Sequence, residues 1–247
     1  MGEEVAKYGM RPGRQTGHYS RFVKSKLGIH TRSTEHYSLD VPAVLKHDFS
    51  RTSHVLQVRP LHEIVHSWAT RDTTLRESLN RAVTDRTVPP NYYTNPIVIA
   101  SEPTALPVPV SIYIDAVPYT LTDSVVAIWV QNLISQQRSV IALIRKRIAC
   151  RCGCRNWCTF YPVLAWLRYT FEVSAAGIFP DSRHDGCHWS EQDSVRQQNA
   201  GMLLAARCVM VQLRGDWSEF CERTGPNVTE PPPPPPPKPR SRRIRFL

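Results

Sequence analysis

Four cysteines lie close together in the segment IACRCGCRNWC, residues 148–158, interspersed with arginines. Thiolate sulfur is a preferred ligand of zinc, which takes four ligands in a tetrahedron. Cys152 and Cys154 can chelate one ion around the glycine between them, and Cys158 can return to the same ion. Cys150 is one candidate for the fourth ligand; the others lie in the segment RHDGCHW and are His184, Cys187 and His188. The pattern predicts a Zn²⁺ site; the alternative is a set of reduced cysteines that fill a loop.

Two aspartates form a second candidate site. Asp115 ends the segment SIYID and Asp216 ends MVQLRGD, and both segments have the pattern of β-strands. Carboxylates that converge from different strands hold the pair of divalent cations, ~3.5–4 Å apart, that catalyses phosphoryl transfer. Mg²⁺ prefers such oxygen ligands, so we predict that the two aspartates hold Mg²⁺ as a catalytic pair. The alternative is a solvent-facing strand end at Asp115 and a turn or capping residue at Asp216, with Asp123 as a rival for the first position.

Basic residues are distributed unevenly along the chain, whose formal net charge is +10. Residues 124–171 contain no acidic residue, and residues 238–247 hold five basic residues and no acid. A surface of this sign attracts polyanions, so we expect DNA as a partner. The alternative is a generically basic protein whose tail is only a localisation signal. The residues expected to contact phosphates are Arg145, Lys146, Arg147, Arg151, Arg155, Arg242 and Arg243.

Hydrophobic periodicity predicts the elements that would position these residues. Short connections suit antiparallel hairpins between the first three of four expected strands, which cover 108–115, 124–130, 139–144 and 208–217. After the cysteines, an apolar stripe predicts a helix with Pro162 in an early turn and Gly177 at its end. A possible capping box at Ser190 predicts a second helix over about 191–206. One or two amphipathic helices are expected over 61–86.

These elements divide the chain into four expected parts. They are a loosely ordered basic region (1–59), a helical segment and linker (60–100), an incomplete RNase H-like core (101–224), and a polyproline and basic tail (225–247). The fold class is α+β: three antiparallel strands, helices and a further strand, with a helical N-terminal region and disordered termini. The order of elements is that of an RNase H-like core, although the order alone also fits other α+β arrangements, so the assignment depends on the two aspartates.

Targeting signals and partners are constrained by composition. The chain begins without an apolar signal-peptide region, and no apolar run reaches the ~18 residues that span a bilayer. We therefore expect a nuclear or cytoplasmic protein that is not secreted and has no membrane partner, and we leave its oligomeric state open. The seven prolines at 231–237 adopt polyproline II, which suits SH3- or WW-type partners.

The stretch from LPVPVSIYIDAVPYTLTDSVVAIWVQNL through CRCGCRNWC and SRHDG to VQLRGDWSEFC resembles a large family of uncharacterised, mobile-element-type proteins that is expanded in certain protist genomes. The organisation of that family is similar to cut-and-paste DDE/D transposases with an RNase H-like core. The resemblance covers residues 88–223, and its most specific parts are the CRCGCxxWC and GDW-E blocks.

The resemblance implies that Asp115 and Asp216 are the first two carboxylates of a transposase site. Such enzymes carry a third acid on a helix well downstream, whereas Glu219 and Glu222 follow the second aspartate too closely to replace it. We therefore expect a transposase-derived nucleic-acid-binding protein with an incomplete nuclease or strand-transfer site and little or no enzymatic turnover. One alternative is an active metal-dependent nuclease or transposase. Another is a non-catalytic interaction scaffold with a polyproline tail.

Overall fold

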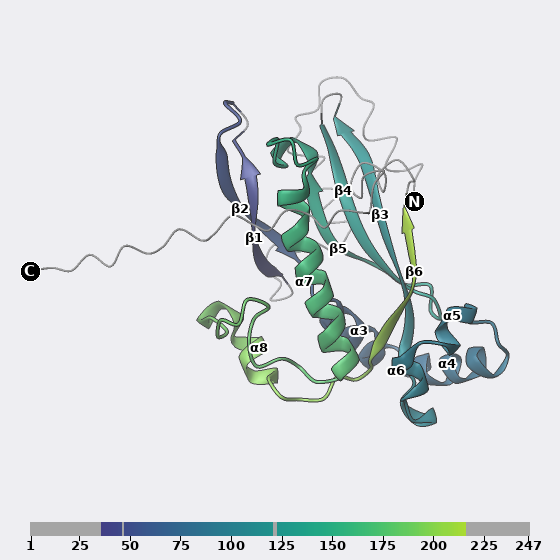
Figure 1. The fold of residues 1–247 in the computed structure, drawn as a ribbon. Coiled ribbons are helices and arrows are strands. Elements are labelled where there is room, and N and C mark those ends of the chain that lie inside the picture. Colours follow the sequence, from purple (N-terminus) through teal and green to yellow (C-terminus); the bar gives the residue numbers. More distant parts are fainter. Residues whose placement is uncertain (1–35, 46, 121–122, 216–247) are drawn as a thin grey trace, which may run out of the picture.

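A computed structural model describes residues 36–215 except residues 46, 121 and 122. These residues form an α+β fold with one mixed, six-stranded sheet in the order β1-β2-β5-β4-β3-β6 (Figure 1). The strands are β1 (Tyr37–Val44), β2 (Arg51–Val58), β3 (Val108–Thr120), β4 (Asp123–Asn132), β5 (Arg138–Arg145) and β6 (Cys208–Gly215). The helices are α3 (Leu61–Arg71), α4 (Leu75–Thr84), α5 (Pro90–Tyr93), α6 (Pro96–Ile99), α7 (Trp157–Ala176) and α8 (Ser194–Asn199). Three short 3₁₀ turns are η1 (Pro103–Ala105), η2 (Lys146–Ile148) and η3 (Glu191–Asp193).

The centre of the sheet is an antiparallel meander of β3, β4 and β5. Apolar alternation explains these strands, because Val110 and Ile112 are buried on one face of β3 while Tyr113 is exposed on the other. The three strands predicted from the sequence are confirmed, and each is longer than expected. The fourth predicted strand is also confirmed, as β6, which pairs with β3 in parallel.

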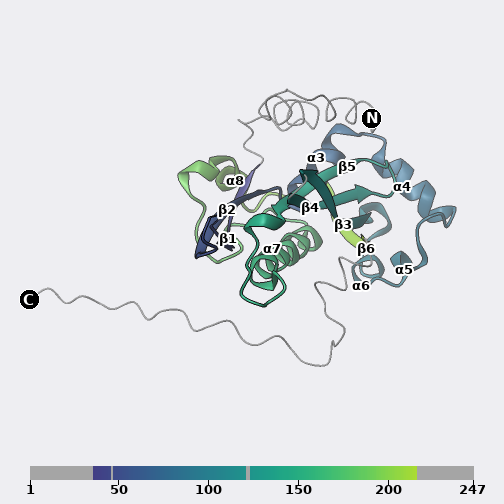
Figure 2. The same ribbon diagram turned by 90° about the horizontal axis from the view of Figure 1, so that it is seen from above.

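Helix α7 makes the crossover that a parallel pairing requires, and it lies along one face of the sheet (Figure 2). Its buried face includes Phe160, Val163 and Trp166, which pack into the main hydrophobic core with the inward residues of the sheet and with α3. Gly177 ends the helix in the left-handed conformation, as predicted. The helix begins at Trp157, earlier than expected, so Pro162 lies inside it and has no N–H to donate to the carbonyl of Cys158.

The expectation of a loosely ordered region over 1–59 is wrong for residues 37–58, which form the hairpin β1–β2. Tyr37, Leu39 and Val41 of β1 alternate with exposed residues and bury their side chains in the main core. Pro42 is tolerated because β1 is an edge strand of the sheet. Residues 1–35 and 216–247 are outside the described part of the chain, so the expectation of disordered termini is not tested.

The prediction of one or two helices over 61–86 is confirmed. The segment forms α3 and α4, separated by a turn in which Asp72 Oδ1 accepts hydrogen bonds from the backbone N–H and hydroxyl of Thr74. The helix expected over 191–206 is only α8, because Gly201 adopts a positive φ of 77° soon after it. Within the described residues, no helix has the length and hydropathy needed to cross a membrane.

Candidate metal centre

The four cysteines of the segment 148–158 converge in the structure. The Sγ atoms of Cys150, Cys152, Cys154 and Cys158 all lie within 4.8 Å of one another. The Sγ atoms of Cys152 and Cys158 are 3.7 Å apart. A tetrahedron with zinc–sulfur bonds of ~2.3 Å has sulfur–sulfur edges of ~3.8 Å. The cluster therefore has the ligand type, number and spacing to hold a metal ion such as zinc.

The backbone of the loop explains this convergence. Gly153, Arg155 and Asn156 have positive φ angles of 86°, 49° and 67°, which reverse the chain between the second, third and fourth cysteines. Helix α7 then begins at Trp157, and the backbone N–H of Cys158 donates a hydrogen bond to Cys154 Sγ at 3.4 Å. An N–H group at a helix N-terminus favours a negatively charged sulfur.

Proton affinities differ strongly among three of the thiols. Hydrogen bonds from Cys154 and then Cys150 lower the pKa of Cys152 to about 6. Burial raises the pKa of Cys158 to about 12, and burial also raises the pKa of Cys150. Cys152 therefore has the most acidic of these three thiols. A divalent cation displaces the thiol protons when it binds, because metal ligation requires deprotonated sulfur.

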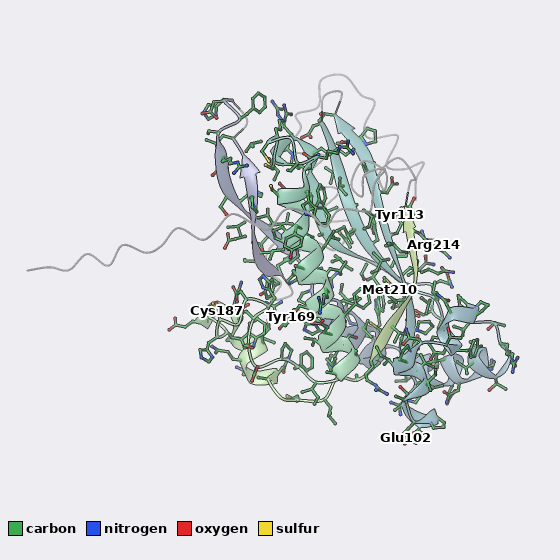
Figure 3. The ribbon with its side chains drawn as sticks, viewed as in Figure 1. Glu102, Tyr113, Tyr169, Cys187, Met210 and Arg214 are labelled. Carbon is green, nitrogen blue, oxygen red and sulfur yellow. The ribbon has the colours of Figure 1, made fainter. Side chains whose placement is uncertain are left out.

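The structure places Cys150, and not a residue of the segment RHDGCHW, beside the other three cysteines. Cys150 is buried, with 2% of its surface exposed, and belongs to the group of four sulfurs. His184 instead makes a hydrogen bond through Nδ1 with the hydroxyl of Tyr37. Cys187 is exposed, and it lies near α8 rather than near the start of α7 (Figure 3). The segment RHDGCHW therefore adds no ligand to the cluster in this structure.

The cysteine loop is attached to β1 through a buried threonine that the sequence analysis did not single out. Thr159 Oγ1 accepts a hydrogen bond from the backbone N–H of Cys150 at 2.9 Å and donates one to the carbonyl of Pro42 at 2.6 Å. Ala149 forms an isolated antiparallel bridge with Ala43. The spacing of the residues gives no signal for the contacts to β1, because these join positions more than a hundred residues apart.

Of the predicted aspartate pair, the structure describes one member. Asp115 lies partly buried in β3, and its Oδ2 accepts a hydrogen bond from the hydroxyl of Tyr113 at 3.4 Å. The last register pair between β3 and β6 is Ile114 with Gly215. The pair before it is Tyr113 with Arg214, and Figure 3 shows these two residues close together. Asp216 is outside the described residues.

The predicted basic residues separate into different environments. Arg145 makes an ion pair with Asp123, through Nη2 at 2.7 Å and Nε at 3.0 Å from Oδ2. The carboxylate of Asp123 is buried, with 2% of its side chain exposed, and it also accepts a hydrogen bond from the backbone N–H of Arg147. Arg145 is thus the counter-ion of a buried carboxylate, and Asp123 is engaged on the side of β4 that faces β5.

Lys146 and Arg147 lie in η2, between β5 and the cysteine loop, and both are partly buried. Arg151 and Arg155 are exposed within the cysteine loop, and the guanidinium of Arg151 lies 4.3 Å from the centre of the Phe49 ring. Arg242 and Arg243 are outside the described residues. Arg145 is also exposed but is paired with Asp123, so the exposed candidates outside that ion pair are Arg151 and Arg155, in the cysteine loop.

Comparison of the chain with protein-family models, with curated proteins and with solved structures gave no match.

Proposed function

We propose that the chain is a transposase-derived nucleic-acid-binding protein, built on an RNase H-like core with an incomplete two-metal site at Asp115 and Asp216. The observation that carries this proposal is the arrangement of four strands. Strands β5, β4 and β3 are antiparallel neighbours, and β6 is added beside β3 in parallel after the crossover helix α7. An RNase H-like core has this order and these directions.

The register between β3 and β6 supports the assignment of the carboxylates. Asp115 and Asp216 each follow directly after a member of the last register pair, Ile114 and Gly215. Residues paired in adjacent parallel strands present their side chains on the same face of the sheet. We propose that this register continues by one step, which would pair Asp115 with Asp216 and meet the first requirement of a two-metal site for Mg²⁺.

The second metal in the proposal is zinc. A Cys₄ site has no open coordination position, so zinc there is structural rather than catalytic. The site shapes the exposed loop that carries Arg151 and Arg155, and we propose that these arginines contact the phosphates of DNA. Such contacts are independent of sequence, and their strength depends on salt because each neutralised phosphate releases condensed counterions.

The aspartate pair is tested with Mn²⁺, a paramagnetic probe that Mg²⁺ displaces. Zinc-loaded protein is titrated with Mn²⁺, and bound ion is measured by electron paramagnetic resonance. We expect the Mg²⁺-displaceable binding to be lost in Asp115→Asn and in Asp216→Asn. The matched control is Asp40→Asn, which removes an exposed strand carboxylate from β1. Binding that is equal in all four proteins would refute the pair.

The nucleic-acid interface is tested by fluorescence anisotropy with a labelled DNA duplex. About four phosphate contacts predict a roughly hundredfold loss of affinity between about 50 and 200 mM salt. The double variant Arg151→Ala, Arg155→Ala should weaken binding and reduce the salt slope. The control Arg168→Ala removes the same charge from a residue of α7 that is paired with Glu172 at 2.7 Å, and it should change little. Affinity that does not respond to salt would contradict the proposal.

The same proteins separate the two alternative functions. A DNA-nicking assay with Mg²⁺ should give little or no cleavage, because no third acid is evident in the sequence. Robust cleavage that Asp115→Asn abolishes would instead establish an active nuclease. Deletion of residues 226–247 tests the scaffold alternative, which predicts that capture by SH3- or WW-type domains depends on that segment while DNA binding is absent.

A further inference from the structure

The hairpin β1–β2 is joined to the rest of the sheet only near one of its ends. Strands β1 and β2 pair over their full length, from Tyr37 with Val58 to Val44 with Arg51. By contrast, β2 and β5 share a single register pair, Val58 with Ala142, followed by a backbone hydrogen bond from Arg59 to Ile141 at 2.9 Å. Figure 1 shows the hairpin diverging from β5 beyond this point.

The distal half of the hairpin, defined here as residues 40–54, is held instead by the cysteine loop and the start of α7. Thr159 donates to the carbonyl of Pro42, and Ala149 bridges to Ala43. The guanidinium of Arg151 packs on the ring of Phe49. Backbone, side-chain and ring contacts therefore all connect one short loop to one short stretch of hairpin.

The electrostatics of the cysteine cluster also reach β2. The thiol of Cys152, one of the four sulfur ligands, raises the pKa of Arg51, the first residue of β2. Four thiolates around one divalent cation carry a net charge of −2, and a guanidinium beside them offsets part of this charge.

We infer that zinc bound by the four cysteines acts as a clamp that fixes the distal half of the hairpin to the N-terminus of α7. This inference rests on the zinc centre proposed above and assigns it a regulatory consequence. With zinc, the loop has one conformation, and the contacts to Pro42, Ala43 and Phe49 persist. Without zinc, residues 148–158 lose their cross-link, and the contacts of Pro42, Ala43 and Phe49 with the cysteine loop and Thr159 open, while Val41 stays in the main core and β3, β4 and β5 remain paired.

The test is hydrogen–deuterium exchange of the full chain, with zinc content measured on the same samples. We expect about one zinc ion per chain. Chelation should accelerate exchange of backbone amides in residues 40–54 by about tenfold or more. Exchange in residues 124–132 of β4 should stay unchanged, since those amides pair within the central meander.

Matched variants separate the clamp from general effects of cysteine loss. Cys152→Ser with Cys154→Ser should abolish zinc binding and reproduce the effect of chelation. Cys187→Ser removes an exposed thiol outside the cluster and should keep both zinc and hairpin protection. Phe49→Ala should accelerate exchange in the distal half of the hairpin without loss of zinc. This variant keeps all the cysteines, so it tests the clamp even if the cysteine variants do not fold.

Three outcomes would overturn the inference in distinguishable ways. Protein without zinc and with freely titratable thiols would overturn both the zinc centre and the clamp. Bound zinc whose removal leaves exchange in residues 40–54 unchanged would overturn the clamp alone. Equal acceleration in β4 would also overturn it, because zinc would then support the whole domain. None of these outcomes decides the Mn²⁺ and DNA experiments, which test the aspartate pair and the basic loop independently.

Discussion

Replacement of Thr159 by valine is the most direct perturbation of the contact between the cysteine loop and β1. Valine has nearly the same shape as threonine, so the substitution leaves almost no cavity and removes only the hydroxyl. In the native protein that hydroxyl is fully buried, accepts from the N–H of Cys150 and donates to the carbonyl of Pro42. The variant therefore leaves one backbone donor and one backbone acceptor without this partner, in a region where water has little access.

The magnitude follows from the number of groups left unpaired. A buried polar group that loses its hydrogen-bond partner costs about 1–3 kcal/mol. Two such groups in Thr159→Val predict a loss of about 2–6 kcal/mol in the free energy of unfolding, a large share of the ~5–15 kcal/mol that stabilises a typical domain. With a urea m-value of ~2–3 kcal/mol/M, the midpoint should fall by about 1–2 M.

The assay is equilibrium urea unfolding at saturating zinc, followed by tryptophan fluorescence. Thr170→Val is the matched control, because Thr170 is equally buried in α7 but its hydroxyl donates to the carbonyl of Leu167 in the same helix. That carbonyl retains its helical hydrogen bond, so the control should lose only about 1 kcal/mol or less. Equal losses in the two variants would refute the argument that Thr159 links the loop to the hairpin.

Three further predictions concern other parts of the fold. Arg145→Ala removes the counter-ion of the buried Asp123 carboxylate and should lower the free energy of unfolding by about 3 kcal/mol in urea titrations. Burial lowers the pKa of His62 from 6.5 to about 3, so below pH 6.5 the unfolded chain binds a proton that the native protein does not. Stability should fall by about 2 kcal/mol between about pH 7.5 and pH 5 through this histidine, and His62→Leu should remove that part of the slope. Gly177→Ala places a Cβ at a φ of +76° and 3.0 Å from Cδ of Arg207, which predicts a loss of about 1–2 kcal/mol by thermal or urea unfolding.

Each of these predictions has its own control. Arg138→Ala removes an exposed arginine at the start of β5 and should change stability by less than about 0.5 kcal/mol. An unchanged pH slope in His62→Leu would mean that the buried imidazole titrates normally. Gly201→Ala also has a positive φ, but its Cβ would meet no atom within 4 Å, so it should be less destabilising than Gly177→Ala. A larger effect at Gly201 would contradict the steric reasoning.

Periodicity was sufficient to locate the central strands and the long helix. The alternation in residues 108–115 and the apolar runs after it are local properties, and a buried strand or helix face needs them wherever it lies in the fold. The same reasoning missed the hairpin, although Tyr37, Leu39 and Val41 alternate with polar residues. The signal was masked because β2 buries only Leu56 and Val58 and exposes most of its other side chains. Proline is also unfavourable inside a sheet, and the place of Pro42 on an edge strand is known only from the fold.

For the candidate metal site, the sequence identified the cysteines that could be ligands. The three-dimensional structure determined which four of them lie close enough to bind one ion. Spacing alone identified Cys152, Cys154 and Cys158 as ligands that can share an ion, because these residues are too close in the chain to separate widely. Spacing left the fourth ligand open, and only the path of the loop brings Cys150 within reach. The acid-free stretch likewise suggested that Arg145 was available to phosphate, whereas its counter-ion, Asp123, lies on the neighbouring strand. The sequence determines which residues can be metal ligands and which of them are near enough in the chain to share an ion. Which residues distant in the chain become partners is decided by how the strands pair.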